Sequence, residues 1–446
     1  MNRAERRRSG EHRDAKRRRR GLAEAIRQHR AGDLRQAERA YAARLQADPG
    51  DPDALHYLGV LRHQQGRSDE GEVLIVRALE AAPNYVDAWN NLGNVRRDCG
   101  KLDLAEMAYR QALALDDAHA NAWSNIGAVL RARGRLPEAI AALEAAIERA
   151  PRTTNAHYNL GSALRSAGRL GEAIRAYARA LEIDPTHARA HEMLGRMLHL
   201  AGEHDAAAKI FRSWSEVEPE NPVPVHMLAA CSGTNVPARA SDAYVRRTFD
   251  DFAASFDEVL LERLDYHAPE LVLAALSAAL GAPRAAHAVL DAGCGTGLCG
   301  PLLRPYARTL TGVDLSPRML HKARARATYD ALVEHELVAY MREHASEFDV
   351  VASADTLCYF GDLAEAFAAA RSALRPRGWF AFSVERADGA DAYRINPHGR
   401  YSHARDYVAA TLARTGFGDA HVTEAVLRRE AGAPVEGLVV RAQATG

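Results

Sequence analysis

The chain has few cysteines and lacks long apolar runs. Its 446 residues include no Cys-x-x-Cys pair, so the sequence indicates neither a zinc site nor a disulfide framework. The five cysteines are Cys99, Cys231, Cys294, Cys299 and Cys358. The longest apolar stretches reach only about ten residues, too few to span a bilayer. Since the start, MNRAERRRSG, also lacks the apolar core of a signal peptide, we expect a cytoplasmic protein.

An excess of charge of either sign is also lacking, because 58 Lys and Arg residues balance 58 Asp and Glu residues. This balance hides a basic leader. Residues 1–20 hold ten Lys or Arg against three Asp or Glu, a net charge of +7. Such a run is able to contact RNA or an anionic membrane surface. Since no aromatic residue interleaves the arginines, as stacking on bases requires, we expect a flexible, solvated leader that binds neither, and no DNA partner.

Composition places the chain among ordinary globular proteins. Apolar residues make up 47% and charged residues 26%, which excludes collagen-like, mucin-like and wholly disordered chains. The length predicts about three domains, or fewer where one part is a repeat array.

A step of 34 residues recurs through the first half of the chain. It relates the glycines Gly32, Gly66, Gly100, Gly134, Gly168 and Gly202. It also relates the prolines Pro49, Pro83, Pro151, Pro185 and Pro219, with Asp117 in the one missing place. Leu-Gly or Ile-Gly pairs keep the same step from positions 58, 92, 126, 160 and 194. This pattern resembles the tetratricopeptide repeat, a pair of antiparallel helices.

The resemblance implies an α-solenoid, a tetratricopeptide superhelix, over residues 21–235. In each repeat the glycine of the Leu-Gly pair lets the second helix approach the first closely, and proline ends the unit because it cannot continue a helix. One helix pair cannot bury its apolar face alone. Six repeats therefore stack into a continuous core with a concave surface, and a capping helix follows around residues 223–230.

Three asparagines, Asn91, Asn125 and Asn159, precede the Leu-Gly or Ile-Gly pair of consecutive repeats. A side-chain amide can donate to and accept from a peptide backbone, so this ladder suits an extended chain in the groove. It resembles the asparagine ladder of tetratricopeptide superhelices in peptide-glycosylating transferases, which implies a peptide or protein partner. The alternative is that these asparagines only face water, and the ladder does stop at Tyr57 and Met193.

After Pro237 the 34-residue register is lost, and a β-α alternation begins. An apolar strand over residues 288–292 runs into the turn Gly293-Cys294-Gly295-Thr296-Gly297. Glycine allows a tight turn and lets a ligand lie against the backbone. The spacing differs from the G-x-G-x-x-G fingerprint of dinucleotide sites. The next strand ends at Asp314, nineteen residues after Gly295, where a carboxylate can accept both hydroxyls of a ribose.

These residues resemble the class I S-adenosylmethionine-dependent methyltransferases. VLDAGCGTG and TGVDLSPRML match the first two motifs of that family, and FDVVASADTLCYFGDL and LRPRGWFAFSVE match its fourth and fifth strands. The likeness covers residues 240–446 and implies an α/β Rossmann-like domain with a seven-stranded, mostly parallel sheet. The whole chain resembles a bacterial family of methyltransferases that carry tetratricopeptide repeats.

The resemblance also implies a role for each site residue. Gly293, Gly295 and Gly297 would hold the methionine end of S-adenosylmethionine, and Asp291 would orient it through water. Asp314 would hold the ribose, Glu336 the adenine amine, and Asp355 would lie where the methyl group meets the acceptor. Two neighbours in the motifs, Cys294 and Leu315, are assigned to the same cofactor site. Phe252 and Phe256 would close a lid, although core packing explains them nearly as well.

The chemistry that this resemblance implies needs no metal, since the sulfonium already activates the methyl group. A general base is optional. The best polar candidates are Tyr401 and His403, expected in a loop after the fifth strand, although such residues can also only cap the next helix. The segment ADTLCY lacks the Asn/Asp-Pro-Pro-aromatic motif of amino-methylating DNA enzymes, and we find no three-cysteine cluster for radical chemistry.

Three functional hypotheses follow. The repeats bind a peptide or protein that the second domain methylates; or the enzyme methylates a small metabolite while the repeats serve assembly; or the chain is a non-catalytic scaffold. The intact glycines and both acids disfavour the third. The sequence leaves open the acceptor, the atom that is methylated and the oligomeric state.

Overall fold

The computed structural model describes residues 21–389, 392–430 and 432–446, so the basic leader predicted at residues 1–20 lies outside it. The chain divides into two compact units, Met1–Met197 and Leu198–Gly446. This division groups α12 (His204–Val217) and α13 (Pro222–Ser232), which continue the repeat register, with the sheet. No helix in the described ranges combines the length and the apolar character needed to cross a membrane.

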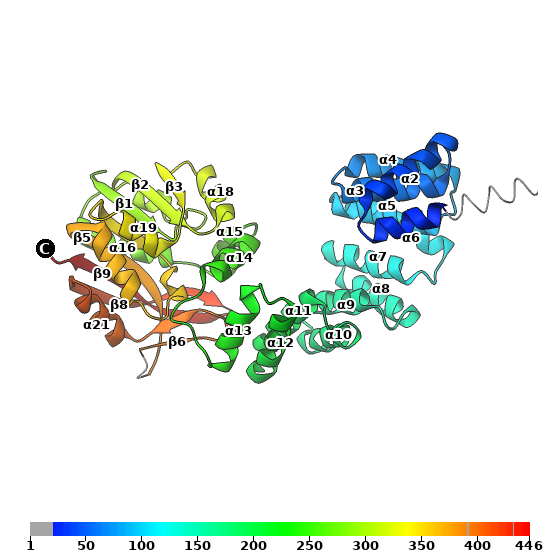
Figure 1. Cartoon of the computed structure of the whole chain (residues 1–446). Helices are drawn as coiled ribbons and strands as arrows, with labels where there is room; N and C mark the ends of the chain where they lie inside the picture. The colour runs from blue at the N-terminus through cyan, green and yellow to red at the C-terminus, as the bar shows by residue number, and fades with distance from the viewer. Residues whose placement is uncertain (1–20, 390–391, 431) are drawn as a thin grey trace, which may run out of the picture. The chain divides into compact units, whose positions relative to one another are not determined.

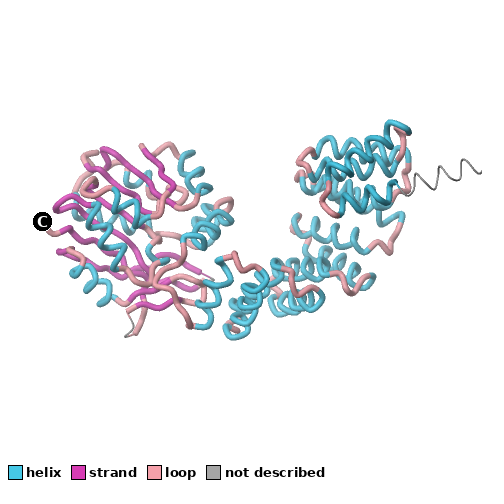
Figure 2. The backbone as a smooth tube through the Cα atoms, viewed as in Figure 1, coloured by secondary structure: helices cyan, strands magenta, loops and turns pink. Residues whose placement is uncertain are grey.

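The first unit is built from helix pairs (Figures 1 and 2). A helix at residues 21–30 precedes α2 (Leu34–Ala47), α3 (Pro52–Gln64), α4 (Ser68–Ala81), α5 (Val86–Asp98), α6 (Leu102–Leu115), α7 (Ala120–Ala132), α8 (Leu136–Arg149), α9 (Thr154–Ser166), α10 (Leu170–Ile183) and α11 (Ala188–Leu200). The glycines at the 34-residue step have φ between +73° and +83° in the turn inside each pair. A left-handed glycine there ends the first helix at little steric cost.

The second recurring glycine lies where the two helices of a pair touch. A Cβ on Gly93 would lie 2.4 Å from Tyr109 Cε1, and one on Gly161 would lie 2.8 Å from Tyr177 Cδ1. Both tyrosines are fully buried. The close helix contact predicted from the Leu-Gly pairs is therefore confirmed at these repeats.

The second unit contains a sheet whose main order is β3-β2-β1-β4-β5-β9-β8. The strands are β1 (His287–Ala292), β2 (Ala307–Asp314), β3 (Ala331–Glu334), β4 (Phe348–Ser353), β5 (Leu374–Arg386), β8 (Phe417–Glu430) and β9 (Ala433–Ala444). β1 to β5 are mutually parallel, and β9 is antiparallel to both its neighbours. This confirms the predicted mostly parallel sheet. Two short strands that we did not predict, β6 (Tyr393–Ile395) and β7 (Tyr401–His403), pair beside the end of β5.

Helices cover both faces of this sheet (Figure 1). Val350 of β4 packs with Val272 of α16 (Ala268–Leu280), whereas the next residue, Val351, packs with Phe367 of α20 (Ala364–Ala373). Successive residues of a strand face opposite sides of the sheet, so β4 is buried on both faces. The other helices are α14 (Asp242–Phe252), α15 (Phe256–Glu258), η1 (Val259–Arg263), α17 (Gly300–Leu303), α18 (Pro317–Ala325), α19 (Leu337–Glu343), η2 (Leu357–Tyr359) and α21 (Arg405–Arg414).

α13 and the segment after it pack against the β6–β7 part of the second unit. His226 is buried, donates from Nε2 to Gly399 O at 2.8 Å, and stacks on Tyr244 with ring centroids 3.9 Å apart. Tyr401 Oη–H donates to Pro237 O at 2.7 Å. The helical segment before residue 240 is therefore part of the packing of this unit.

Candidate functional site

Glycine shapes the turn after β1. Gly293, Gly295 and Gly297 have φ values of +81°, +54° and +85°, which L side chains rarely adopt. A Cβ on Gly293 would lie 2.3 Å from the side chain of Thr356, just beyond β4. At Gly295, by contrast, a Cβ would meet no heavy atom of the described residues within 4 Å. The turn is closed against Thr356 and open at Gly295, where a ligand can approach the backbone.

Asp314 ends β2 and is tied to the glycine turn. Its Oδ2 accepts the N–H of Gly295 at 2.9 Å, and its Oδ1 accepts the N–H of Ser316 at 2.8 Å. Burial raises the pKa of the Asp314 carboxyl, although these two N–H groups act in the opposite direction. The backbone N–H of Leu315 acts on the same carboxyl, and a carboxylate has about four acceptor positions, so some acceptor capacity remains. Leu315, the next residue, is half-buried.

Asp291 lies at the end of β1 and is almost fully buried. Its Oδ2 accepts the hydroxyl of Tyr329 at 2.6 Å, while its Oδ1 has no hydrogen-bond partner within the described residues. Burial raises the pKa of this carboxyl to about 7. Tyr329 also lies 3.0 Å from where a Cβ on Gly297 would be, so it supports the turn. Cys294 is buried as well, and its Sγ lies near Gly312, as Tyr329 does.

Glu336 lies two residues beyond β3, where it caps α19 rather than ending the strand. Its carboxylate accepts the N–H groups of Val338 at 3.1 Å and Ala339 at 2.7 Å, and it pairs with Arg239 at 2.7 Å. Burial acts to raise the pKa of Glu336, but these partners outweigh it, and the pKa lies below its usual range. The geometry gives this residue a capping role, and its predicted contact with adenine stays a prediction.

The helices before the sheet contact the loops after β1 and β2. Ser316 Oγ–H donates to Asp250 Oδ1 of α14, and Thr296 Oγ1–H donates to Asp257 Oδ1 of α15, both at 2.5 Å. Arg326 pairs with Asp257 at 2.7 Å. These three polar contacts hold α14 and α15 against the segments that follow β1 and β2.

An aromatic group accompanies these contacts. The rings of Phe252 and Phe256 meet edge to face with centroids 5.2 Å apart. Phe249 contacts both Phe256, at 6.0 Å, and Tyr359, at 5.4 Å. Phe249, which the sequence did not single out, therefore connects the predicted lid residue Phe256 with the segment after β4, and the lid role of Phe252 and Phe256 stays a prediction.

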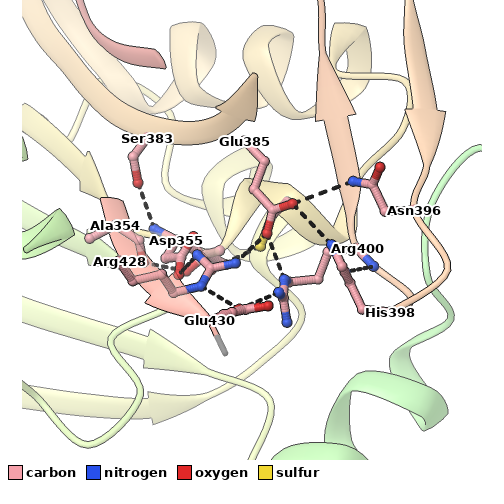
Figure 3. Close-up of polar contacts among 11 residues, drawn as sticks. Ala354, Asp355, Ser383, Glu385, Asn396, His398, Arg400, Arg428 and Glu430 are labelled. Atoms are coloured by element: carbon pink, nitrogen blue, oxygen red, sulfur yellow. Dashed lines mark hydrogen bonds and ion pairs between the residues drawn. The ribbon is translucent and has the colours of Figure 1, made fainter. Parts of the chain in front are cut away.

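A buried charged cluster lies where β4, β5 and β8 end (Figure 3). We call it the Arg428 cluster, and it comprises Asp355, Glu385, Arg400, Arg428 and Glu430. Arg428 is only 2% exposed, and it donates to Asp355 Oδ2 at 2.6 Å, to Glu430 Oε1 at 2.7 Å and to Glu385. Arg400 donates to Glu385 at 2.6 Å and to Glu430. Three carboxylates thus face two guanidinium groups.

The arginines of the cluster lower the pKa values of Glu385 and Glu430. Burial acts to raise the pKa of Glu385, but Arg400 and Arg428 outweigh it and lower this pKa to about 2. The neighbouring His398 is half-buried, and its desolvation lowers its pKa to about 4, with Arg400 acting in the same direction. His398 is therefore neutral near pH 7. With Glu385 ionised and His398 neutral, the arginines are neutralised by carboxylates of the chain itself.

Asp355 has an unusual backbone within this cluster. Its φ is +55°, which is costly for a residue with a side chain. Its N–H donates to Ser383 Oγ at 2.9 Å, and its Oδ1 is buried without a hydrogen-bond partner in the part of the chain that the structure describes. Because Thr356 adjoins it and contacts Gly293, this oxygen belongs to the end of the sheet that carries the glycine turn.

The expected loop at Tyr401 and His403 is wrong, because both residues belong to β7. Both are fully buried. Tyr401 bonds to Pro237 O, and His403 Nε2 donates to Phe360 O at 2.8 Å. Burial lowers the pKa of His403 to about 4. These contacts hold the fold together, and the predicted catalytic role gains no support from them.

The asparagine ladder of the first unit links neighbouring repeats. Each amide nitrogen reaches the residue 35 positions earlier: Asn91 to His56 Nε2 at 2.8 Å, Asn125 to Asn90 Oδ1 at 3.0 Å, and Asn159 to Ser124 Oγ at 3.2 Å. All three asparagines are half-buried. Each of these asparagines therefore uses one amide donor for a hydrogen bond inside the array, which the sequence did not indicate. Their predicted contact with a peptide stays a prediction.

Sequence reasoning missed the partners that organise the site. Arg428 and Glu430 belong to β8 and carry no motif, and Glu385 and Arg400 come from separate segments. No local sequence signal therefore indicates this buried charge.

Comparison with known proteins assigns different families to the helical repeats and to the sheet, with the repeats running to residue 217. Residues 290–382 match the family described as "Methyltransferase domain". Residues 28–93, 84–152, 118–186 and 158–217 match families described as "Tetratricopeptide repeat".

Individual relatives cover one part of the chain at a time. A ubiquinone biosynthesis O-methyltransferase of Thiobacillus denitrificans is 32% identical over 172 residues, which are 35% of this chain and 68% of that protein. A malonyl-[acyl-carrier protein] O-methyltransferase of Methylovorus sp. is 31% identical over 196 residues, which are 39% of this chain and 63% of that protein. A crystal structure of MamA covers 36% of this chain and 95% of its own, with 28% identity and a TM-score of 0.34.

Proposed function

Because the chain belongs to the methyltransferase family and carries tetratricopeptide repeats, we propose that it transfers a methyl group from S-adenosylmethionine to an acceptor on a peptide or protein bound by the repeats. The observation that carries the cofactor assignment is the open backbone at Gly295 next to Asp314. Bound S-adenosylmethionine would supply a methyl group already activated by its sulfonium.

The residues around the turn fit this cofactor. The open side of Gly295 lets a ligand lie against the backbone, and the Asp314 carboxylate beside it would accept a ribose hydroxyl. Cys294 and Leu315 flank these two residues, and Glu336 is assigned to the adenine amine. α14 and α15, held by Asp250 and Asp257, would cover the site and exclude water.

We assign Asp355 to the acceptor end of the site. Arg428 fixes one carboxylate oxygen, so the unpartnered Oδ1 is oriented to accept a hydrogen bond. An acceptor with a hydroxyl or amine hydrogen would satisfy that oxygen. The protein would thereby position the attacking atom, which is the main demand of methyl transfer.

A second candidate function is methylation of a small metabolite, with the repeats serving assembly. The identity to a ubiquinone biosynthesis O-methyltransferase favours it, because that name describes O-methylation in the synthesis of a small molecule. The identity to a malonyl-[acyl-carrier protein] enzyme favours an acceptor that a protein carries. In both candidates the same cofactor residues act.

The cofactor assignment is tested with Asp314→Asn. The substitution removes the charge and one acceptor, and hydrogen bonds to a charged group contribute roughly 1.5–3 kcal/mol each, so affinity for S-adenosylmethionine should fall at least about tenfold. The matched control is Asp419→Asn, an exposed residue at the start of β8, where affinity should not change. Calorimetry that gives equal affinity for wild type and a folded Asp314→Asn protein would remove Asp314 from the site.

A further inference from the structure

Three metal-binding side chains converge in the helical part of the second unit. His199 lies in the last turn of α11, His204 begins α12 and Cys231 lies near the end of α13. One ligand atom from each lies within 4.8 Å of the other two. All three side chains are half-buried. This group shares no residue with the glycine turn or the Arg428 cluster.

The spacing of the two imidazoles matches that of zinc ligands. His199 Nδ1 and His204 Nδ1 are 3.4 Å apart, and their rings are tilted by 34° with centroids 5.3 Å apart. Two nitrogens at a Zn–N distance of about 2.05 Å in a tetrahedron lie about 3.4 Å from each other. Imidazole nitrogen and cysteine sulfur are the ligands that zinc prefers in proteins.

The repeat register shows that His204 departs from its equivalents. Steps of 34 residues place Leu34, Leu102, Leu136 and Leu170 at its position. His63 and Ser68, which occupy the positions of His199 and His204 in an earlier repeat, form a simple 2.9 Å hydrogen bond. An imidazole in place of a leucine, directed at another imidazole and near a thiol, is not a requirement of the repeat.

We infer that His199, His204 and Cys231 bind a zinc ion that ties the start of α12 to the end of α13. Binding breaks the S–H bond of Cys231, forms a sulfur–zinc bond and releases the proton to solvent. Three protein ligands leave a fourth position for water. The absence of a Cys-x-x-Cys pair predicts no zinc site, but the three ligands, which are five and 27 residues apart, come together where α13 packs on α12.

The test uses the full chain, purified without a histidine tag, reduced and stripped of metal. Titration with Zn²⁺ should give one equivalent per chain. Titration with Co²⁺ should give visible d–d bands and a near-ultraviolet thiolate-to-cobalt band. Cys231→Ala should abolish the thiolate band. His204→Leu, which restores the residue of the other repeats, should weaken zinc binding by more than the roughly tenfold loss seen when only a residue that orients a ligand is removed.

The matched control is Cys99→Ala, which removes an exposed cysteine and should bind zinc like wild type. Circular dichroism establishes that each variant is folded. Wild type that binds no zinc would overturn the inference, and so would a thiolate-to-cobalt band that survives in Cys231→Ala. Equal zinc affinity in wild type and His204→Leu would also overturn it. None of these measurements depends on methyl transfer, so the site and the proposed function fail separately.

Discussion

The asparagine ladder of the first unit and the Arg428 cluster of the second pair their polar side chains in different ways. In the first unit, Asn125 and Asn159 make neutral hydrogen bonds to the preceding repeat, and each bond involves two residues only. In the second unit, Arg428 serves three carboxylates at once, and Arg400 shares two of them. Loss of one amide should therefore cost the first unit little, whereas loss of one charge should leave several buried charges in the second without their partner.

The largest effect should follow Arg428→Met. It removes the partner of Asp355, Glu385 and Glu430, and leaving buried charges unpaired costs roughly 3–5 kcal/mol. The free energy of unfolding is measured with urea. The adjacent Arg429, whose side chain is 52% exposed, is the control, and Arg429→Met should change stability by less than about 0.5 kcal/mol. Equal effects of the two substitutions would show that Arg428 contributes no more to stability than an exposed arginine does.

A smaller, pH-dependent effect should follow Asp291→Asn. Burial raises the pKa of Asp291 from 3.8 to about 7. Because this pKa is raised in the folded state, the wild-type free energy of unfolding should fall as pH rises from about 4 to about 7. The loss should reach roughly 4 kcal/mol. Because asparagine does not titrate, the stability of the variant relative to wild type should rise between these pH values and stay constant above them.

Asp349 supplies a control of opposite sign for this experiment. Burial acts to raise its pKa, but the N–H of Ala288 and the guanidinium of Arg375 outweigh it and lower the pKa. Asp349→Asn should therefore destabilise the protein at neutral pH, and this loss should shrink as pH falls below the usual carboxyl range. Urea unfolding at several pH values measures the stability of both variants and of wild type. A constant difference between Asp291→Asn and wild type across this range would contradict the buried, raised pKa.

The smallest effect per residue should come from the asparagine ladder. Asn91→Ala, Asn125→Ala and Asn159→Ala each remove one hydrogen bond between repeats, worth about 0.5–1.5 kcal/mol net. If the remaining amide capacity also anchors a peptide acceptor, the triple variant should raise KM while its affinity for S-adenosylmethionine stays unchanged. Melting curves separate the two effects.

Asn155, an exposed residue of α9, is the matched control for the ladder. Asn155→Ala should change neither the melting temperature nor KM. A folded triple variant with unchanged KM for the natural acceptor would remove the ladder from acceptor binding and favour the small-metabolite hypothesis.

The two units also differ in how much of them could be predicted. A 34-residue period repeats the same turn and contact, so Gly66 or Gly93 could be placed from spacing alone. The glycine turn and Asp314 were readable because a strand, a turn and a second strand follow directly in sequence. Predictions failed where pairing is long-range, because β7 pairs with both β5 and β6, and Tyr401 and His403 are buried there.

Long-range pairing also hides the charges of the candidate site. Asp355 follows β4, Glu385 belongs to β5, and Arg428 belongs to β8, which reaches them through β9. No local sequence pattern indicates that Arg428 is buried. The left-handed φ of Asp355 is likewise set by its surroundings and not by its residue type.

Transfer of a labelled methyl group tests the central claim most directly. The full chain is incubated with methyl-labelled S-adenosylmethionine and a cell extract, and label is measured in the macromolecular and small-molecule fractions. We expect label in the macromolecular fraction with wild type and with Asp419→Asn, and strongly reduced label with Asp314→Asn at limiting cofactor. Label confined to small molecules would contradict a peptide or protein acceptor, and the absence of transfer into either fraction would contradict methyl transfer itself.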